Sequence, residues 1–141
     1  WLPFSKRELI ITGLFLYWGE GGKTQRHIVS INNTDPQVIK FALYWMIYGL
    51  NVPKEKIQVY LHLYDDMNEN EEKKYWSKEL HMPIYQFSKP YIKKSKRADV
   101  DHKGFGHGTC GLRTFDTVLK ERILMAITAI ADNFAAKIGK T

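Results

Sequence analysis

The chain has 141 residues, of which 44% are hydrophobic and 13% aromatic, and its 21 lysines and arginines exceed its 15 acidic residues, giving a formal charge of +6. This length is typical of one domain, and the apolar content excludes a disordered chain. The apolar stretches 9–18 and 123–131 are shorter than the roughly 18 to 20 residues that cross a bilayer, so we expect no membrane span. The lone Cys110 excludes an internal disulfide and, with no visible signal peptide, indicates a cytoplasmic protein.

A first helix is expected over residues 5–20. Ser5 and Glu8 have the spacing of a capping box, in which the Ser5 hydroxyl accepts from the Glu8 amide and the Glu8 carboxylate accepts from the Ser5 amide. The body of this helix, residues 9–18, is apolar nearly all round, which indicates burial on more than one face. The glycine-rich segment 19–22 then ends the helix.

Two elements are expected next along the chain. Residues 26–32 have the pattern of a short strand, and Asp35 and Pro36 have the pattern of an N-cap followed by a first helical turn. The second helix then covers residues 36–49, where apolar side chains recur with the period of a core-packing stripe.

The strand pattern is clearest over residues 57–64, where apolar and polar side chains alternate so that one face is dry and the other wet. A surface helix is expected over residues 71–80. Residues 83–92 and 108–114 have the composition of two further strands.

Asp116 has the position of an N-cap for a long last helix that ends at about Ile138. The element order is therefore α-β-α-β-α-β-β-α, which is typical of a single α+β domain over residues 1–141. Because the chain begins at Trp1 and not at a methionine, we also expect it to be a trimmed chain or a fragment of a longer protein.

One carboxylate, that of Glu20, stands among glycines at the end of the first helix. A helix C-terminus is the negative end of the helix dipole, so a carboxylate gains no stabilisation there. A hard cation would explain this position, because Mg²⁺ takes oxygen ligands such as the Glu20 carboxylate, the carbonyl oxygen of Gly19 at the helix end and DNA phosphates. The alternative is a solvent-facing glutamate in a glycine turn.

Residues 13–21 read Gly-Leu-Phe-Leu-Tyr-Trp-Gly-Glu-Gly and resemble a degenerate LAGLIDADG motif, with Glu20 at the position of the motif's last acid. Residues 33–36 at the start of the second helix, and residues 108–110 and 115–117 before the last helix, also resemble features of bacterial LAGLIDADG-type proteins. The sequence is thus similar over nearly its whole length to the LAGLIDADG homing-endonuclease-like family, with one motif in the chain.

This resemblance implies a LAGLIDADG homing-endonuclease-like fold of αββαββα type, in which an antiparallel sheet packs against helices. It implies that helix 5–20 forms the interface of a homodimer, and that Glu20 of each copy binds Mg²⁺ or another divalent cation. Family members that cleave DNA use such metals for phosphodiester hydrolysis. Dimer symmetry implies a pseudo-palindromic site in double-stranded DNA.

The chain departs from the family pattern at two positions of the first helix. Phe15 and Trp18 stand where the motif usually has a small residue and an acid, and close helix packing favours small side chains. The family also places a basic residue near the scissile phosphate, and Lys103 is the candidate here. Since the family includes relatives that bind DNA without cutting it, the alternative to an endonuclease is a non-cleaving DNA-binding domain of a transcription regulator.

The wet face of strand 57–64 supports DNA binding independently of the resemblance. A glutamine such as Gln58 can contact adenine through two hydrogen bonds from a strand in the major groove. The basic stretch 89–103 would contact phosphates, and the alternative for it is a solvated loop. The predicted DNA-binding residues are Arg26, Ser30, Asn32, Gln58, Tyr60, His62, Lys89, Lys93, Lys94, Lys96 and Arg97.

Other kinds of site fit the sequence less well. His102 and His107 flank a short glycine-containing segment, but no cysteine pair accompanies them, so we interpret them as loop histidines and not as zinc ligands. Cys110 lacks the strand-turn-helix elbow of a nucleophile. A protein-interaction domain without a nucleic-acid role remains a third alternative.

Overall fold

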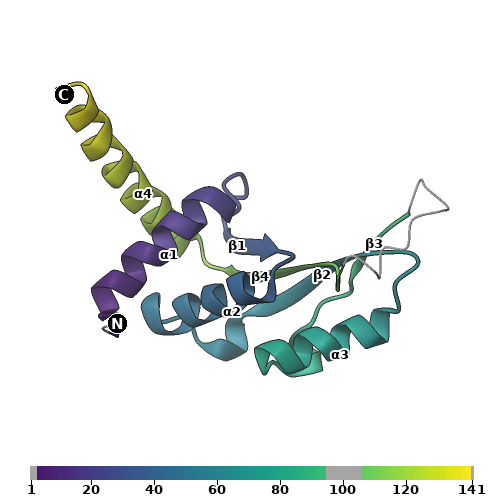
Figure 1. Cartoon of the computed structure of the whole chain (residues 1–141). Helices are drawn as coiled ribbons and strands as arrows, with labels where there is room; N and C mark the ends of the chain where they lie inside the picture. The colour runs from purple at the N-terminus through teal and green to yellow at the C-terminus, as the bar shows by residue number, and fades with distance from the viewer. Residues whose placement is uncertain (1–2, 95–105, 141) are drawn as a thin grey trace.

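The computed structural model describes residues 3–94 and 106–140, and it has the predicted element order (Figure 1). The chain is an α+β protein in which a four-stranded mixed sheet packs against helices. The helices are α1 (Lys6–Glu20), α2 (Pro36–Tyr44), α3 (Glu69–Leu80) and α4 (Thr117–Ile138), and the strands are β1 (Ile28–Asn33), β2 (Gln58–Tyr64), β3 (Tyr91–Lys93) and β4 (Thr109–Phe115).

The two predicted N-caps near the start of the chain are confirmed. The Glu8 amide donates to the Ser5 hydroxyl at 3.2 Å, and the Ser5 amide donates to the Glu8 carboxylate at 2.7 Å, which completes the capping box of α1. The hydrogen bond from the Ser5 backbone amide to the carboxylate, followed by the effect of the Ser5 side chain, lowers the pKa of Glu8. Asp35 caps α2 by accepting from the Gln37 amide at 2.9 Å.

The strand order in the sheet is β1-β4-β2-β3, with β4 antiparallel to both β1 and β2. The expectation of an antiparallel sheet is wrong for the β2–β3 pair, because β3 runs parallel to β2. The cause is α3, which carries the chain back along the sheet so that β3 begins at the same end as β2. The implied αββαββα order places two strands between the first two helices, whereas the structure has one strand there, β1. Before β1, Gly21 makes only an isolated antiparallel bridge with Ile31.

The predicted strand over residues 83–92 is wrong for most of its length. A short 3₁₀ helix, Ile84–Gln86, takes its place, and only Tyr91–Lys93 pairs as a strand. Pro90 has no amide hydrogen for a ladder. The Gln86 side chain instead ties this segment to the protein by donating to the carbonyls of Lys54 at 2.8 Å and Ile57 at 2.9 Å.

The predicted helix 36–49 changes its form near its end. The α-helical part stops at Tyr44, and Trp45–Gly49 forms a π-helical turn. This turn begins at the buried Trp45, whose indole Nε1 donates to the Ile10 carbonyl at 3.3 Å. Gly13 makes the contact possible, since a Cβ built there would lie 2.0 Å from that indole nitrogen.

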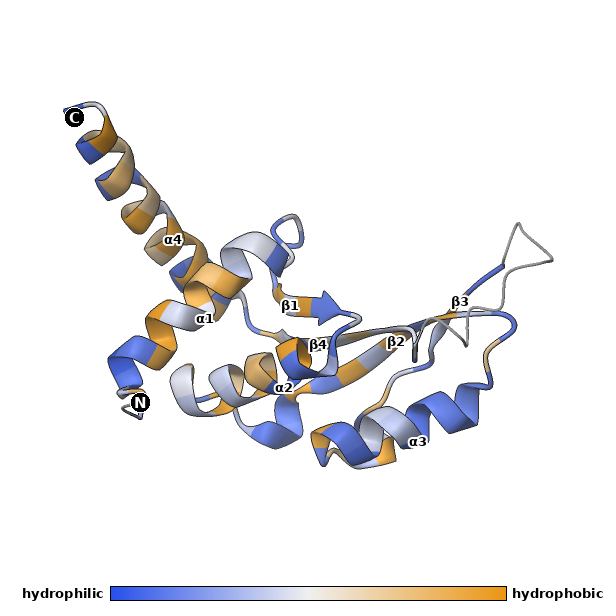
Figure 2. Ribbon diagram, in the orientation of Figure 1, coloured by the Kyte–Doolittle hydropathy of each residue, from blue (hydrophilic) through white to orange (hydrophobic). Residues whose placement is uncertain are grey.

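The core lies against one face of the sheet, on the side where α2 and α3 lie (Figure 1). The predicted alternation in strand 57–64 is confirmed, because its odd-numbered positions are buried and its even-numbered ones are exposed or half-buried. In Figure 2, α3 is hydrophilic along most of its length and α1 is hydrophobic in its middle. Within the described residues, no helix combines the length and apolarity required to cross a bilayer.

Candidate nucleic-acid interface

The alternate residues of the four strands that do not enter the core form a second face of the sheet, here called the outer face. The strand register places Ser30, Arg113 and Gln58 in one row across it. A neighbouring row contains Asn32, Gly111 and Tyr60, and further along His62 pairs with both Thr109 and Tyr91. The side chains of the outer face are those of Ile28, Ser30, Asn32, Gln58, Tyr60, His62, Tyr64, Tyr91, Lys93, Thr109, Arg113 and Phe115.

Arg113 lies at the centre of a contact network on the outer face. Its Nε donates to the Gln58 side-chain oxygen at 2.7 Å, and its Nη2 lies 3.4 Å from the Ser88 hydroxyl. The guanidinium carbon lies 4.9 Å from the ring centroid of Tyr60 and 5.8 Å from that of Phe115. Arg113 was not among the predicted DNA-binding residues, although its alternation with the apolar Leu112 on the same strand was an available signal.

Aromatic rings form a row beside Arg113. A Cβ at Gly111 would lie 2.1 Å from the Tyr60 ring, so the missing side chain lets this ring lie over the β4 backbone. The Tyr60 hydroxyl accepts a hydrogen bond from the side-chain amide Nδ2 of Asn32 at 3.3 Å. The ring centroids are 5.7 Å apart for Tyr60 and His62, and 5.3 Å apart for His62 and Tyr91.

The structure brings only part of the predicted basic surface to this face. Arg26 lies in a turn before β1, where it forms an exposed 3.7 Å ion pair with Glu121; its predicted place in the strand is therefore wrong. Lys93 lies on β3 with its Nζ 5.9 Å from the Tyr64 ring centroid. Lys89 and Lys94 are exposed on either side of β3. The predictions for Lys96, Arg97 and Lys103 fall outside the described residues.

Glu20 lies at the β1 edge of the sheet. Directly after it, Gly21 bridges to Ile31 and the Gly22 amide donates to the Ser30 carbonyl at 2.9 Å. Glu20 itself is exposed, as is Gly19, and its carboxylate makes no hydrogen bond or ion pair within residues 3–94 and 106–140. One exposed carboxylate is thus available at this edge.

A buried lysine, Lys120 of α4, forms hydrogen bonds with α1, with β1 and with the loop that follows Glu20. Its Nζ donates to the Tyr17 hydroxyl at 2.9 Å, to the Ile28 carbonyl at 2.8 Å and to the Gly22 carbonyl. The Tyr17 hydroxyl in turn donates to the Gly22 carbonyl at 2.5 Å. Burial lowers the pKa of Lys120 and raises that of Tyr17, because each charged form loses hydration. This network fixes the end of α1, and with it the segment that carries Glu20.

The close contact at Gly21 gives that residue a structural role. A Cβ there would lie 2.5 Å from the ring and the carbonyl oxygen of Tyr17, so Gly21 is required by packing against α1. Gly22 is also tightly enclosed, since its Cβ would lie 2.5 Å from the Ser30 hydroxyl.

A histidine and a carboxylate meet at the other end of the sheet. The buried Glu72 lies 2.7 Å from Nδ1 of His107, whose ring stacks on Tyr75 with centroids 3.5 Å apart. In the part of the chain that the structure describes, no three His, Cys, Asp or Glu side chains gather as they would around a metal. His107 lies in a loop as predicted, and burial raises the pKa of the Cys110 thiol, which disfavours a nucleophile.

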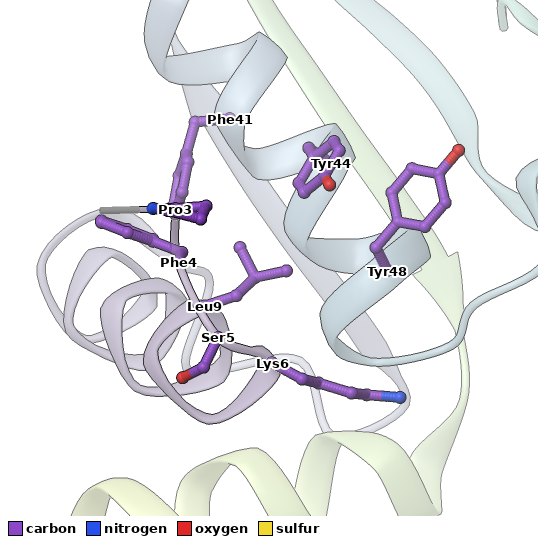
Figure 3. Close-up of a pocket in the computed structure, with 8 residues that line it drawn as sticks. All are labelled: Pro3, Phe4, Ser5, Lys6, Leu9, Phe41, Tyr44 and Tyr48. Carbon is purple, nitrogen blue, oxygen red and sulfur yellow. The ribbon is translucent and has the colours of Figure 1, made fainter. Parts of the chain in front are cut away.

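A surface hollow lies away from these residues, between the start of α1 and the end of α2 with its π-helical turn (Figure 3). None of the residues around it was predicted as a site residue, and they include neither a carboxylate nor a histidine. The lining residues are Pro3, Phe4, Ser5, Lys6, Leu9, Phe41, Tyr44 and Tyr48.

Comparisons with family models, with curated protein sequences and with solved structures find no match to this chain.

Proposed function

We propose that this chain binds double-stranded DNA as a homodimer of the LAGLIDADG type and cleaves a phosphodiester bond with the help of a divalent cation. The observation that carries this proposal is the outer face, where hydrogen-bonding, aromatic and cationic side chains lie in register across the strands. Side chains of a twisted sheet can reach base edges in the major groove, which admits a β-ribbon.

The charge of the chain supports an anionic partner. The formal charge is +6, and Lys89, Lys93 and Lys94 are exposed at the β3 edge of the sheet. Lysines in such positions contact phosphates and release counterions, so we expect the affinity for duplex DNA to fall steeply with salt concentration. The edge lysines hold the backbone while the outer face contacts the bases.

The surface of α1 supports a homodimer. Ile11, Phe15 and Trp18 have helical spacing and remain between 37% and 47% exposed, although the opposite side of α1 is buried. The expected burial on more than one face is therefore incomplete within a single copy. A second copy packed on this stripe would cover it and bring two Glu20 carboxylates to one two-fold axis, opposite a pseudo-palindromic site.

The donor set at Glu20 fits Mg²⁺ or a similar cation. Mg²⁺ commonly binds through one or two carboxylates and completes its shell with water and substrate phosphates, so one exposed carboxylate from each copy is sufficient. When bound, such a cation activates water and stabilises the leaving oxygen. In this proposal Glu20 holds the cation, while Lys120 and Tyr17 hold the segment that carries Glu20.

The second candidate is a non-cleaving DNA-binding domain of a transcription regulator. Phe15 and Trp18 favour it, because their rings, with centroids 6.1 Å apart, occupy the side of α1 on which a second copy would pack. Large side chains keep two helices apart and would separate the two Glu20 carboxylates. Both candidates require the same outer face, and they differ in whether the bound duplex is cut.

A selection from a randomised duplex library tests the proposal. Ca²⁺ is present during selection because it fills oxygen sites and usually supports little cleavage, and Mg²⁺ is then added to the enriched duplexes. We expect an enriched pseudo-palindrome that Mg²⁺ converts to cut ends. Glu20→Gln should abolish cutting and leave binding unchanged, while the control Glu55→Gln, at an exposed carboxylate of a 3₁₀ turn, should cut normally.

The remaining outcomes separate the two candidates. An enriched duplex that stays intact in Mg²⁺ favours the regulator, and cutting by the Glu20→Gln variant removes Glu20 from the mechanism. Failure to enrich any duplex overturns sequence-specific DNA binding.

A further inference from the structure

We propose that Arg113 is the base-reading residue of the outer face and that it recognises guanine. This inference rests on the proposed binding of duplex DNA and adds the base that the surface selects.

A guanidinium group has five N–H donors in a rigid fork. In Arg113, the Nε donor is used by the Gln58 side-chain oxygen at 2.7 Å, and one Nη2 donor points to the Ser88 hydroxyl at 3.4 Å. Within residues 3–94 and 106–140, both Nη1 donors and one Nη2 donor have no partner, and one N–H of each of these two nitrogens lies on the end edge of the fork. That edge matches the O6 and N7 acceptors that guanine presents in the major groove.

The packing of Arg113 holds this edge in place before DNA binds. The guanidinium lies against the rings of Tyr60 and Phe115, at 4.9 and 5.8 Å from their centroids, and Tyr60 is held in turn by Asn32 and by its position over Gly111. A side chain held in this way loses less conformational freedom on binding than a free surface arginine. Arg113 is therefore pre-organised for a two-bond contact.

The same hydrogen bond changes the role expected of Gln58. A glutamine recognises adenine by accepting from N6 with its oxygen while donating to N7 with its nitrogen. In this structure the Gln58 oxygen already accepts from Arg113 Nε at 2.7 Å, which orients the Gln58 amide toward Arg113 and leaves its oxygen one remaining lone pair. The geometry therefore makes Gln58 a positioning residue for Arg113, in place of the adenine contact expected from the sequence.

The test compares base preferences selected by the wild-type chain and by Arg113→Lys from one duplex library in Ca²⁺. Lysine keeps the charge and loses the fork, so we expect guanine preference at one position of each half-site to fall roughly 10- to 100-fold, with non-specific affinity unchanged. Arg122→Lys is the matched control, since Arg122 is an exposed arginine of α4 and lies outside the outer face; it should keep the wild-type preference. Thermal unfolding of each variant checks that it folds.

Gln58→Met gives the second measurement, because methionine keeps the length of glutamine and removes the acceptor. We expect it to weaken the same guanine preference without changing any adenine position. Loss of an adenine preference instead, or an Arg113→Lys variant that selects the wild-type bases, overturns the assignment to Arg113 and leaves the proposed function standing. If the wild-type chain enriches no duplex, the proposed function fails and this inference fails with it.

Discussion

At the scale of single residues, Lys120 is the most consequential buried polar group. It is 1% exposed, and its ammonium satisfies two carbonyls and one hydroxyl that belong to α1, β1 and the loop between them. A buried ammonium is tolerated only where hydrogen bonds replace its hydration. All three of its protons have acceptors here, which explains how a lysine can stand among buried residues on α4.

We predict that Lys120→Met destabilises the fold by about 2–3 kcal/mol, because it leaves the Ile28 carbonyl without its buried donor and removes one donor from Tyr17 and Gly22. Urea unfolding followed by circular dichroism measures the change. Lys137→Met is the control on the same helix, since Lys137 is exposed, and it should change stability by less than about 0.5 kcal/mol. Equal effects of the two substitutions would contradict a structural role for the Lys120 network.

At the scale of elements, the contact between α1 and the π-helical turn of residues 45–49 decides how α1 packs. Trp45 is fully buried and inserts its indole beside Gly13, with its ring 6.1 Å from that of Tyr17. Two elements far apart in sequence approach closely because one of them has a glycine at the crossing point.

We predict that Gly13→Ala destabilises the chain by about 1–3 kcal/mol, because the added methyl overlaps the Trp45 indole. Gly19→Ala on the same helix is the matched control: a Cβ there meets nothing within 4 Å, so alanine should be neutral or stabilising by up to about 1 kcal/mol. The midpoints of urea unfolding compare the two variants. A neutral Gly13→Ala would show that this crossing is looser than its geometry indicates.

At the scale of the whole molecule, two surfaces are distinct. The outer face presents polar and aromatic side chains across the strands, and α1 presents an apolar stripe of Ile11, Phe15 and Trp18. The C-terminal turns of α4 extend away from the sheet (Figure 1). The proposed function assigns DNA to the outer face and a second copy to the α1 stripe, so that dimerisation and DNA binding can be altered separately.

We predict that Phe15→Glu weakens a homodimer at least about 100-fold, because a two-fold interface loses the buried ring twice and gains two facing charges. Sedimentation equilibrium over a range of protein concentrations measures this. Tyr85→Glu is the control, since Tyr85 is 85% exposed and lies outside α1; it should leave the association unchanged. A wild-type chain that stays monomeric at all concentrations would argue against the α1 interface.

Local patterns in the sequence were sufficient to predict several features of the structure. The capping box of Ser5 and Glu8, the Asp35 cap, the dry and wet faces of strand 57–64 and the order of the elements are all confirmed. Each depends on residues close together in the chain, so side-chain type and spacing carry the information. The shared face of Gln58, Tyr60 and His62, of which the first two are half-buried and the third exposed, follows from the same alternation.

Contacts between distant residues were decided by the tertiary structure alone. The parallel β2–β3 pair follows from the path of α3, and the segment before β3 is held by the Gln86 side chain, which no local pattern encodes. Arg113 contacts Gln58 because β4 pairs with β2. Lys120 contacts Tyr17 because α4 packs on α1. Residue type and spacing fixed which side chains face outward, whereas strand pairing and helix packing decided which of them meet.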